Sequence, residues 1–233
     1  MVDGGLAEQL ASLAALSDPT RRDLYLYVSA QVAPVSRDQA CDALGIARHT
    51  VKFHLDKLVE EGLLETHFKR LTERRGPGAG RPTKLYRRSR RQLSVTVPER
   101  RYDLAGQLLA SAIDRAAAEG LQVVDALAAV AAQWGGTVGD QARETAGRRP
   151  SRDRLTATIC QVLIQYGYEP HREGGRIVLT NCPFEALARE HTRLVCGMNL
   201  SIMTAVADRA SKTRLQARLE PEPSRCCVVL DAG

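Results

Sequence analysis

Two helical patterns meet at a single glycine, Gly45, in the first quarter of the chain. The first begins at Ser36, a residue type that caps helices, and ends at the glycine. The second runs through RHTVKFHLDKLVEEG, where Val51, Leu55 and Leu58 recur with the period of a helix. Two helices joined by a tight glycine turn, the second polar and basic on its outer face, indicate a helix-turn-helix.

The flanking sequence predicts further elements around this pair. Residues 6–16 read as a short apolar helix, and Ser17 or Asp18 can cap another helix with Pro19 in its first turn. After the pair, LLETHFKRLTE and KLYRRS read as strands joined by GPGAGRPT. A hairpin directly after the second helix predicts a wing.

Two other interpretations of the arginine-rich segment 70–92 are less consistent with its residues. A phosphate-binding P-loop ends in glycine, lysine and a hydroxyl residue, whereas Gly80 is followed here by Arg81 and Pro82. A disordered linker would not need the apolar return strand that Leu85 and Tyr86 supply. A structured basic hairpin remains the preferred interpretation.

The positive charge is concentrated in this part of the chain. The formal net charge is +6, and residues 69–101 hold twelve Lys and Arg against two Glu, a balance of +10. The rest of the chain therefore sums to −4. One basic block in a slightly acidic protein indicates a surface for a polyanion, here double-stranded DNA.

We expect the second helix of the pair to enter the major groove, with its outward side chains at base edges or phosphates. We expect the hairpin arginines to contact the phosphate backbone or a minor groove. The predicted DNA-contacting residues are Ser36, Arg48, His49, Thr50, Lys52, His54, Arg74, Arg75, Arg81 and Lys84.

The composition changes after Val97. Residues 97–134 are rich in Ala and Leu with a break near Gly120, which predicts one or two helices with extensive apolar faces. Such faces pack either on the rest of the chain or on a second copy, and we favour a homodimer, because helix-turn-helix proteins commonly span two half-sites. Residues 135–153 read as a polar connector.

The last part predicts a second small domain. A helix over residues 154–168, strands around Gly174–Gly175, a long helix after Pro183 and the closing strands QARLE and CCVVLD give a mixed pattern. The predicted class is α+β in three parts. These are a winged helix-turn-helix at 1–96, a helical dimerisation segment with its connector at 97–150, and a cysteine-containing sensor domain at 151–233.

Six cysteines need an explanation. The chain lacks a signal peptide and any apolar run long enough for a membrane helix, so we expect a cytoplasmic protein with few disulfides. Cys41 and Cys160 stand alone in apolar surroundings and read as packing residues. The other four fall in the last quarter of the chain, at Cys182, Cys196, Cys226 and Cys227.

Thiolates from three elements that converge on one pocket suit an iron–sulfur cluster or a zinc ion. Adjacent strand residues face opposite ways, so at most one of Cys226 and Cys227 should reach a shared site. His191 lies about 140° around the helix from Cys196 and reads as a surface or supporting group. Buried packing thiols and a thiol redox switch between Cys196 and Cys226 or Cys227 remain open.

The stretches LSDPTRRDLYLYV, 36–64 and AGRPTKLYRRS together resemble the winged-helix domain of ArsR-type bacterial transcriptional regulators. NCPFEALAREHTRLVCGMN followed by RCCVV is similar to the sensor half of SufR-like repressors. That resemblance implies a repressor whose four late cysteines hold an iron–sulfur cluster, of the 4Fe–4S type, and report on it to DNA. A zinc site, a redox switch or a small-ligand sensor could take the place of the cluster.

An enzyme is the competing class of function. Cys196 with His191 would be its nucleophile and base, yet no activating third group or glycine-rich oxyanion loop accompanies them. We therefore expect no catalytic activity.

Overall fold

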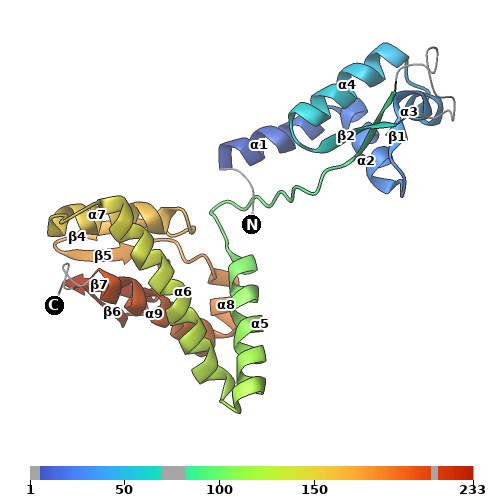
Figure 1. The fold of residues 1–233 in the computed structure, drawn as a ribbon. Coiled ribbons are helices and arrows are strands. Elements are labelled where there is room, and N and C mark those ends of the chain that lie inside the picture. Colours follow the sequence, from blue (N-terminus) through green and yellow to red (C-terminus); the bar gives the residue numbers. More distant parts are fainter. Residues whose placement is uncertain (1–5, 70–81, 211–214, 233) are drawn as a thin grey trace. The chain divides into compact units, whose positions relative to one another are not determined.

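The computed structural model describes residues 6–69, 82–210 and 215–232 and shows a mixed helix and strand protein (Figure 1). Its contacts divide the chain into two compact units, Met1–Val95 and Thr96–Gly233. Each unit has its own hydrophobic core. Among the described residues, no helix is both long and apolar enough to cross a membrane.

The first unit is a bundle of short helices beside a small sheet. Its three strands are antiparallel and lie in the order β1-β3-β2. In chain order, its elements are α1 (Leu6–Ala14), η1 (Ala15–Ser17), α2 (Pro19–Ala30), β1 (Val35–Ser36), α3 (Arg37–Leu44), α4 (Arg48–Glu60), β2 (Leu64–Lys69) and β3 (Thr83–Arg88).

Local capping signals set the helix boundaries as the sequence predicts. The Asp18 carboxylate accepts the backbone N–H of Arg21 at 2.8 Å, with Pro19 in the first turn of α2. Gly45 ends α3 with φ of +66°, a conformation that costs other residues energy. β1 was not predicted, because two residues are too short for a periodic signal. It pairs with β3 through Val35 opposite Tyr86.

The second unit combines five helices with a four-stranded sheet among the described residues. The sheet is antiparallel with strand order β4-β5-β7-β6. In chain order, the elements are α5 (Tyr102–Glu119), α6 (Val123–Ala146), α7 (Arg152–Ile164), β4 (Pro170–Glu173), β5 (Arg176–Leu179), α8 (Glu185–Glu190), α9 (Thr192–Arg209), β6 (Leu215–Leu219) and β7 (Val228–Ala232).

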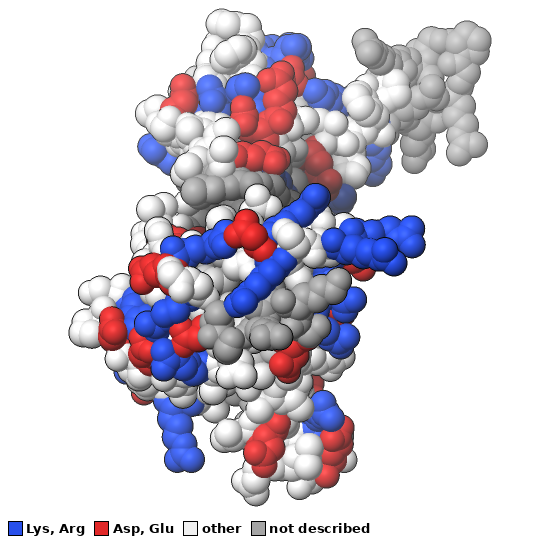
Figure 2. Space-filling model, turned by 90° about the vertical axis from the view of Figure 1, so that its left-hand side faces the viewer, with Lys and Arg blue, Asp and Glu red and all other residues white. Residues whose placement is uncertain are grey.

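Helix α9 is central to this unit. It packs against β6 and β7 on one side and against α6 on the other, while α5 and α7 also pack on α6 (Figure 1). The central helices and the C-terminal elements share one core, whose fully buried side chains include Ile159, Ile177, Phe184, Ile202 and Val228. Positive and negative side chains are interspersed on the face drawn in Figure 2.

Most of the predicted connector, residues 135–153, is helical, and only residues 147–151 connect α6 to α7. Helix α6 continues to Ala146, because its small residues face α9 at very short range. A Cβ atom at Gly135 would meet the backbone of Ile202, and one at Gly139 would lie 2.6 Å from Cβ of Arg209. A hydrophobic pattern in the sequence could not reveal this face of α6, because the contact is made by glycines, which have no side chains to form such a pattern.

The helix expected after Pro183 is in fact two helices. α8 ends at Glu190 and α9 begins at Thr192, with His191 between them at φ −126° and ψ 49°, outside the helical region. Because of this break, the loop before α8 contacts the start of the second unit, where the N–H of Arg101 bonds the carbonyl of Pro183. Helix α9 packs along β6 and β7 of the sheet.

Candidate DNA-binding surface and cysteine pocket

Four of the ten predicted DNA contacts lie on the outer face of α4. Arg48 and Lys52 have side chains 70% and 63% exposed, His49 is exposed, and Thr50 is half-buried. Phe53 is 63% exposed on the same face and was not predicted. Its place one helical turn after His49 is the signal that could have identified it.

Asp56 joins this helix to the wing strand β3. Its carboxylate lies 2.9 Å from Nζ of Lys52 and 2.6 Å from Nζ of Lys84, and it accepts the hydroxyl of Tyr86 at 3.2 Å. Burial acts to raise the pKa of Asp56, but the hydrogen bonds from the two lysines outweigh it and lower the pKa. The carboxylate thus stays ionised and holds both lysines in place.

These side chains border a hollow of about 640 Å³ on the surface of the first unit. Arg37 of α3 and Phe68 of β2 line it together with Lys52 and Lys84. Arg37 is the third cation that lines this hollow. It was not among the predicted contacts, because no pattern in the sequence links the start of α3 to the outer face of α4.

Two predicted contacts are buried, although Ser36 also lines the hollow with Lys52 and Lys84. Ser36 is buried, and its hydroxyl accepts the backbone N–H of Gln39 as the cap of α3, while the Gln39 side chain accepts the N–H of Ser36. His54 is 9% exposed, and its Nδ1 accepts a hydrogen bond from Nε of Arg21 at 3.4 Å. Position 54 faces the core beside Leu55, so both residues serve the fold.

The described residues of the basic block belong to both units. Arg74, Arg75 and Arg81 lie outside the described residues. The Arg91 guanidinium bonds Glu8 at 2.9 Å within the first unit, and the Arg100 side chain is buried in the second unit with Glu185. Lys84 thus lies on the wing strand, whereas Arg91 and Arg100 make contacts inside the first and the second unit.

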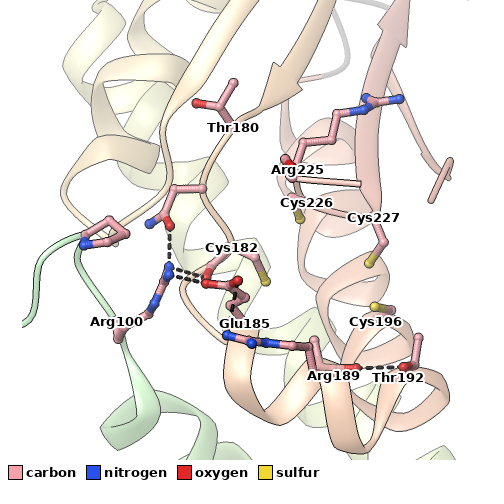
Figure 3. Close-up of a pocket in the computed structure, with 14 residues that line it drawn as sticks. Arg100, Thr180, Cys182, Glu185, Arg189, Thr192, Cys196, Arg225, Cys226 and Cys227 are labelled. Carbon is pink, nitrogen blue, oxygen red and sulfur yellow. Dashed lines mark hydrogen bonds and ion pairs between the residues drawn. The ribbon is translucent and has the colours of Figure 1, made fainter. Parts of the chain in front are cut away.

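The four late cysteines line one pocket of about 710 Å³ in the second unit. Figure 3 shows their sulfur atoms turned toward the same space, with those of Cys196 and Cys227 facing each other. Cys182 lies in the loop before α8, Cys196 on the first turns of α9, and the other two just before β7. Three segments distant in sequence thus place four thiols together.

Cys226 and Cys227 both reach this pocket, which corrects the expectation that only one would. They lie in an irregular segment before β7, so the alternation of a strand does not apply. The N–H of Cys226 donates to the carbonyl of Leu179, and the carbonyl of Cys227 accepts the N–H of Glu220 at 2.8 Å. These bonds to the ends of β5 and β6 fix both cysteines.

The thiols interact with one another, and three of them have raised pKa values. The hydrogen bond with Cys226, together with burial, raises the pKa of Cys182 strongly. The bond to Cys182 lowers the pKa of Cys226, but the bond to Cys227 and burial outweigh it and raise the pKa to about 12. Burial raises the pKa of Cys196. A metal bound here would have to displace the protons of these thiols.

A buried amide is directed at one of the sulfurs. Asn199, on α9, is 1% exposed, and its Nδ2 donates to Sγ of Cys226 at 3.1 Å. The Asn199 carbonyl oxygen accepts the hydroxyl of Tyr168 at 2.7 Å, which fixes the amide orientation. A neutral thiol is a weak acceptor and a thiolate a strong one, so this donor suits a deprotonated Cys226.

Within the described part of the chain, no group of three or more His, Cys, Asp or Glu side chains is arranged to hold a metal ion as it stands. His191 is exposed at the junction of α8 and α9 and does not line the pocket that Cys196 lines. The pocket also holds Arg100 and Arg189, whose charges the sequence pattern did not connect with the cysteines.

Comparison with protein families matches residues 16–67 to a helix-turn-helix domain. The match spans α2 to α4 and most of β2, and it supports a winged-helix regulator of transcription that binds DNA, similar to the ArsR type. Curated proteins and solved structures gave no match.

Proposed function

We propose that this protein is a DNA-binding repressor whose second unit binds an iron–sulfur cluster through Cys182, Cys196, Cys226 and Cys227. One observation carries the proposal: four thiols from three segments line a single pocket. Packing cysteines would have no reason to collect in this way. Because one chain holds both this pocket and a helix-turn-helix, the state of the pocket can alter DNA binding and thereby control transcription.

The residues present fit the cluster by their chemistry. Four cysteine thiolates are the ligand set of 2Fe–2S and 4Fe–4S clusters, and we favour 4Fe–4S. The N–H of Asn199 on Cys226 is the kind of hydrogen bond that adjusts the reduction potential of such a site. Arg100 and Arg189 also line the pocket, but both pair with the carboxylate of Glu185, so the fit rests on the four thiols and Asn199.

When bound, the cluster supplies a group whose charge and integrity change with oxidants and with iron supply. The chain's own residues hold it and transmit its state. The loop with Cys182, the start of α9 and the segment before β7 each contribute ligands, so the bound and free states favour different spacings of these three segments. DNA affinity responds only to that difference.

On the DNA side, α4 enters the major groove with Arg48, His49 and Lys52 outward, and Lys84 lies at the base of the wing. Arg74, Arg75 and Arg81 lie outside the described residues, and their contact with the phosphate backbone stays a prediction. Phe53 joins this face and suits the methyl group of thymine.

A thiol redox switch is the second candidate, and the paired thiols favour it. Cys182 is hydrogen-bonded to Cys226, and Cys196 to Cys227, so either pair could be oxidised to a disulfide. The same thiols could instead bind zinc, and the pocket could instead hold a small ligand.

Anaerobic purification with iron, sulfide and zinc analysis and an absorption spectrum tests the cluster. We expect iron and sulfide in equal amounts, with visible absorption above the protein band. Cys182→Ser and Cys226→Ser should each lose most of both, because a thiolate ligand is removed. Cys160→Ser should keep them, since Cys160 lies on α7 and does not line the pocket. Zinc without sulfide would mean that the cysteines form a zinc site and not a cluster site. A reversible disulfide without any metal would mean that they form a redox switch.

The second unit also supports a homodimer. Ile113 on α5 is 56% exposed, and Val123 and Val124 are exposed at the start of α6. A second copy that covers these apolar side chains would place two copies of α4 on two half-sites.

Sedimentation equilibrium tests this interface. We expect a wild-type dimer, and Ile113→Asp should raise its dissociation constant at least about tenfold, because an unpaired charge would be buried. Ile164→Asp is the matched control, since Ile164 is equally exposed but lies at the end of α7. A monomeric wild type would exclude the dimer, and equal effects of both variants would exclude this face.

A further inference from the structure

The chain enters the second unit through residues 99–102, here called the entry segment. The boundary between the units falls between Val95 and Thr96, so Arg100 lies five residues after the end of the DNA-binding unit. Residues 96–98 connect the entry segment to that unit.

Each residue of the entry segment is bonded to the loop that carries Cys182. The side-chain amide of Asn181 donates to the carbonyl of Glu99 at 3.0 Å. The N–H of Arg101 donates to the carbonyl of Pro183 at 3.0 Å. The hydroxyl of Tyr102 accepts the N–H of Ala186 at 3.4 Å. With the Arg100 side chain, four consecutive residues are thus joined to one short stretch, residues 181–186.

Arg100 makes the central contact. Its Nη1 donates to the backbone carbonyl of Cys182 at 3.0 Å and to the side-chain oxygen of Asn181, and its Nη2 pairs with Glu185. The Arg100 side chain is 14% exposed, so these bonds are largely shielded from water. Figure 3 shows it on one side of the Cys182 loop, with the sulfur on the other.

We propose that Arg100 is the positioning residue that couples the cysteine pocket to the DNA-binding unit. This inference rests on the proposed function and adds the path by which the state of the cysteine pocket reaches the DNA-binding unit. A change in the position of Cys182, when it gains or loses a ligand bond, moves the carbonyl that Arg100 holds. The entry segment follows, and with it the path of the chain that leaves the winged-helix unit.

The test measures coupling rather than binding alone. The dissociation constant for a duplex selected from a random library by the wild-type protein is measured with cluster-loaded and cluster-free protein. The ratio of the two constants should be about 5- to 150-fold for the wild type. Arg100→Met keeps the apolar stem and removes the bonds, so its ratio should fall to within about twofold of one. Its iron and sulfide content should stay at the wild-type level.

Arg189→Met is the matched control. Arg189 lines the same pocket and also pairs with Glu185, at 3.3 Å, but it is 73% exposed and its ion pair lies within α8, so its removal leaves the bonds of Arg100 in place. Its ratio should remain that of the wild type. A loaded Arg100→Met protein with the wild-type ratio would overturn the proposal. A wild type with no cluster, or with a ratio of one, would overturn the proposed function instead.

Hydrogen exchange on the wild-type protein gives a second measurement that needs no variant. Removal of the cluster should speed amide exchange in a peptide covering residues 96–102, where the N–H of Arg101 is bonded to Pro183. Exchange in α7 should be unchanged. Equal exchange of the entry segment in both states would reject the coupling even if Arg100→Met fails to fold.

Discussion

Gly135→Ala is expected to destabilise the second unit by about 3 kcal/mol, near the upper end for overpacking of a closely packed core. The added Cβ would meet the carbonyl oxygen of Ile202 and lie 2.9 Å from its Cα. These atoms belong to the backbone of α9, so the strain is relieved only if α6 and α9 move apart. Such movement would also disturb Cys196, which α9 carries.

Denaturant unfolding followed by tryptophan fluorescence measures this effect. Trp134 is the one tryptophan of the chain and lies on α6 with its ring 5.0 Å from that of Tyr166, so its signal reports on the second unit. Gly106→Ala is the control, because Gly106 is exposed on α5 and a Cβ there would meet no atom within 4 Å. It should stabilise the protein by about 0.5–1 kcal/mol through better helix propensity. An unfolding midpoint of Gly135→Ala equal to that of the wild type would show that the contact between α6 and α9 is looser than described.

The double variant Arg48→Ala, Lys52→Ala should weaken DNA binding by about 2–3 kcal/mol, or roughly 30- to 150-fold. Both side chains project from the outer face of α4 and are largely exposed. If both contact phosphates, the slope of log affinity against log salt should also fall by about 1.8, at 0.9 for each phosphate.

Lys57→Ala is the control for Lys52→Ala alone. Both changes remove one positive charge from α4, but Lys57 lies toward its C-terminal end, paired with Glu61 at 2.9 Å. Its salt slope should stay within about 0.3 of the wild type, whereas Lys52→Ala should lose about 0.9. Fluorescence anisotropy with the selected duplex over a range of salt concentrations measures both. Equal slopes for the two variants would mean that the effect reflects net charge and not this face.

The first unit was largely predictable because its signals are local. A cap at Asp18, a glycine in the left-handed conformation at Gly45 and a helical period through Leu55 each act within a few residues. Sequence patterns say less where side-chain direction depends on packing. His54 is polar but buried, and the Ser36 hydroxyl caps α3.

The second unit was less predictable because its arrangement depends on contacts distant in sequence. The positions of the four late cysteines indicated a shared site, but only the fold shows that Cys226 and Cys227 both reach it. The partners of that site, Asn199 and Arg100, carry no motif and become visible only through the hydrogen bonds they make. The close approach of α6 to α9 likewise depends on glycines that a hydrophobic pattern cannot register.

The bridge at Asp56 has a consequence for how fast and how tightly the surface can engage a duplex. Lys52 on the helix and Lys84 on the wing strand are already immobilised by the same carboxylate. Much of the rotamer entropy that two free lysines would lose on docking is therefore lost before the encounter, as in a preorganised binding site. The Asp56 carboxylate also cancels part of the positive potential of the two lysines. DNA binding should therefore release fewer counterions than the number of basic residues on this surface implies.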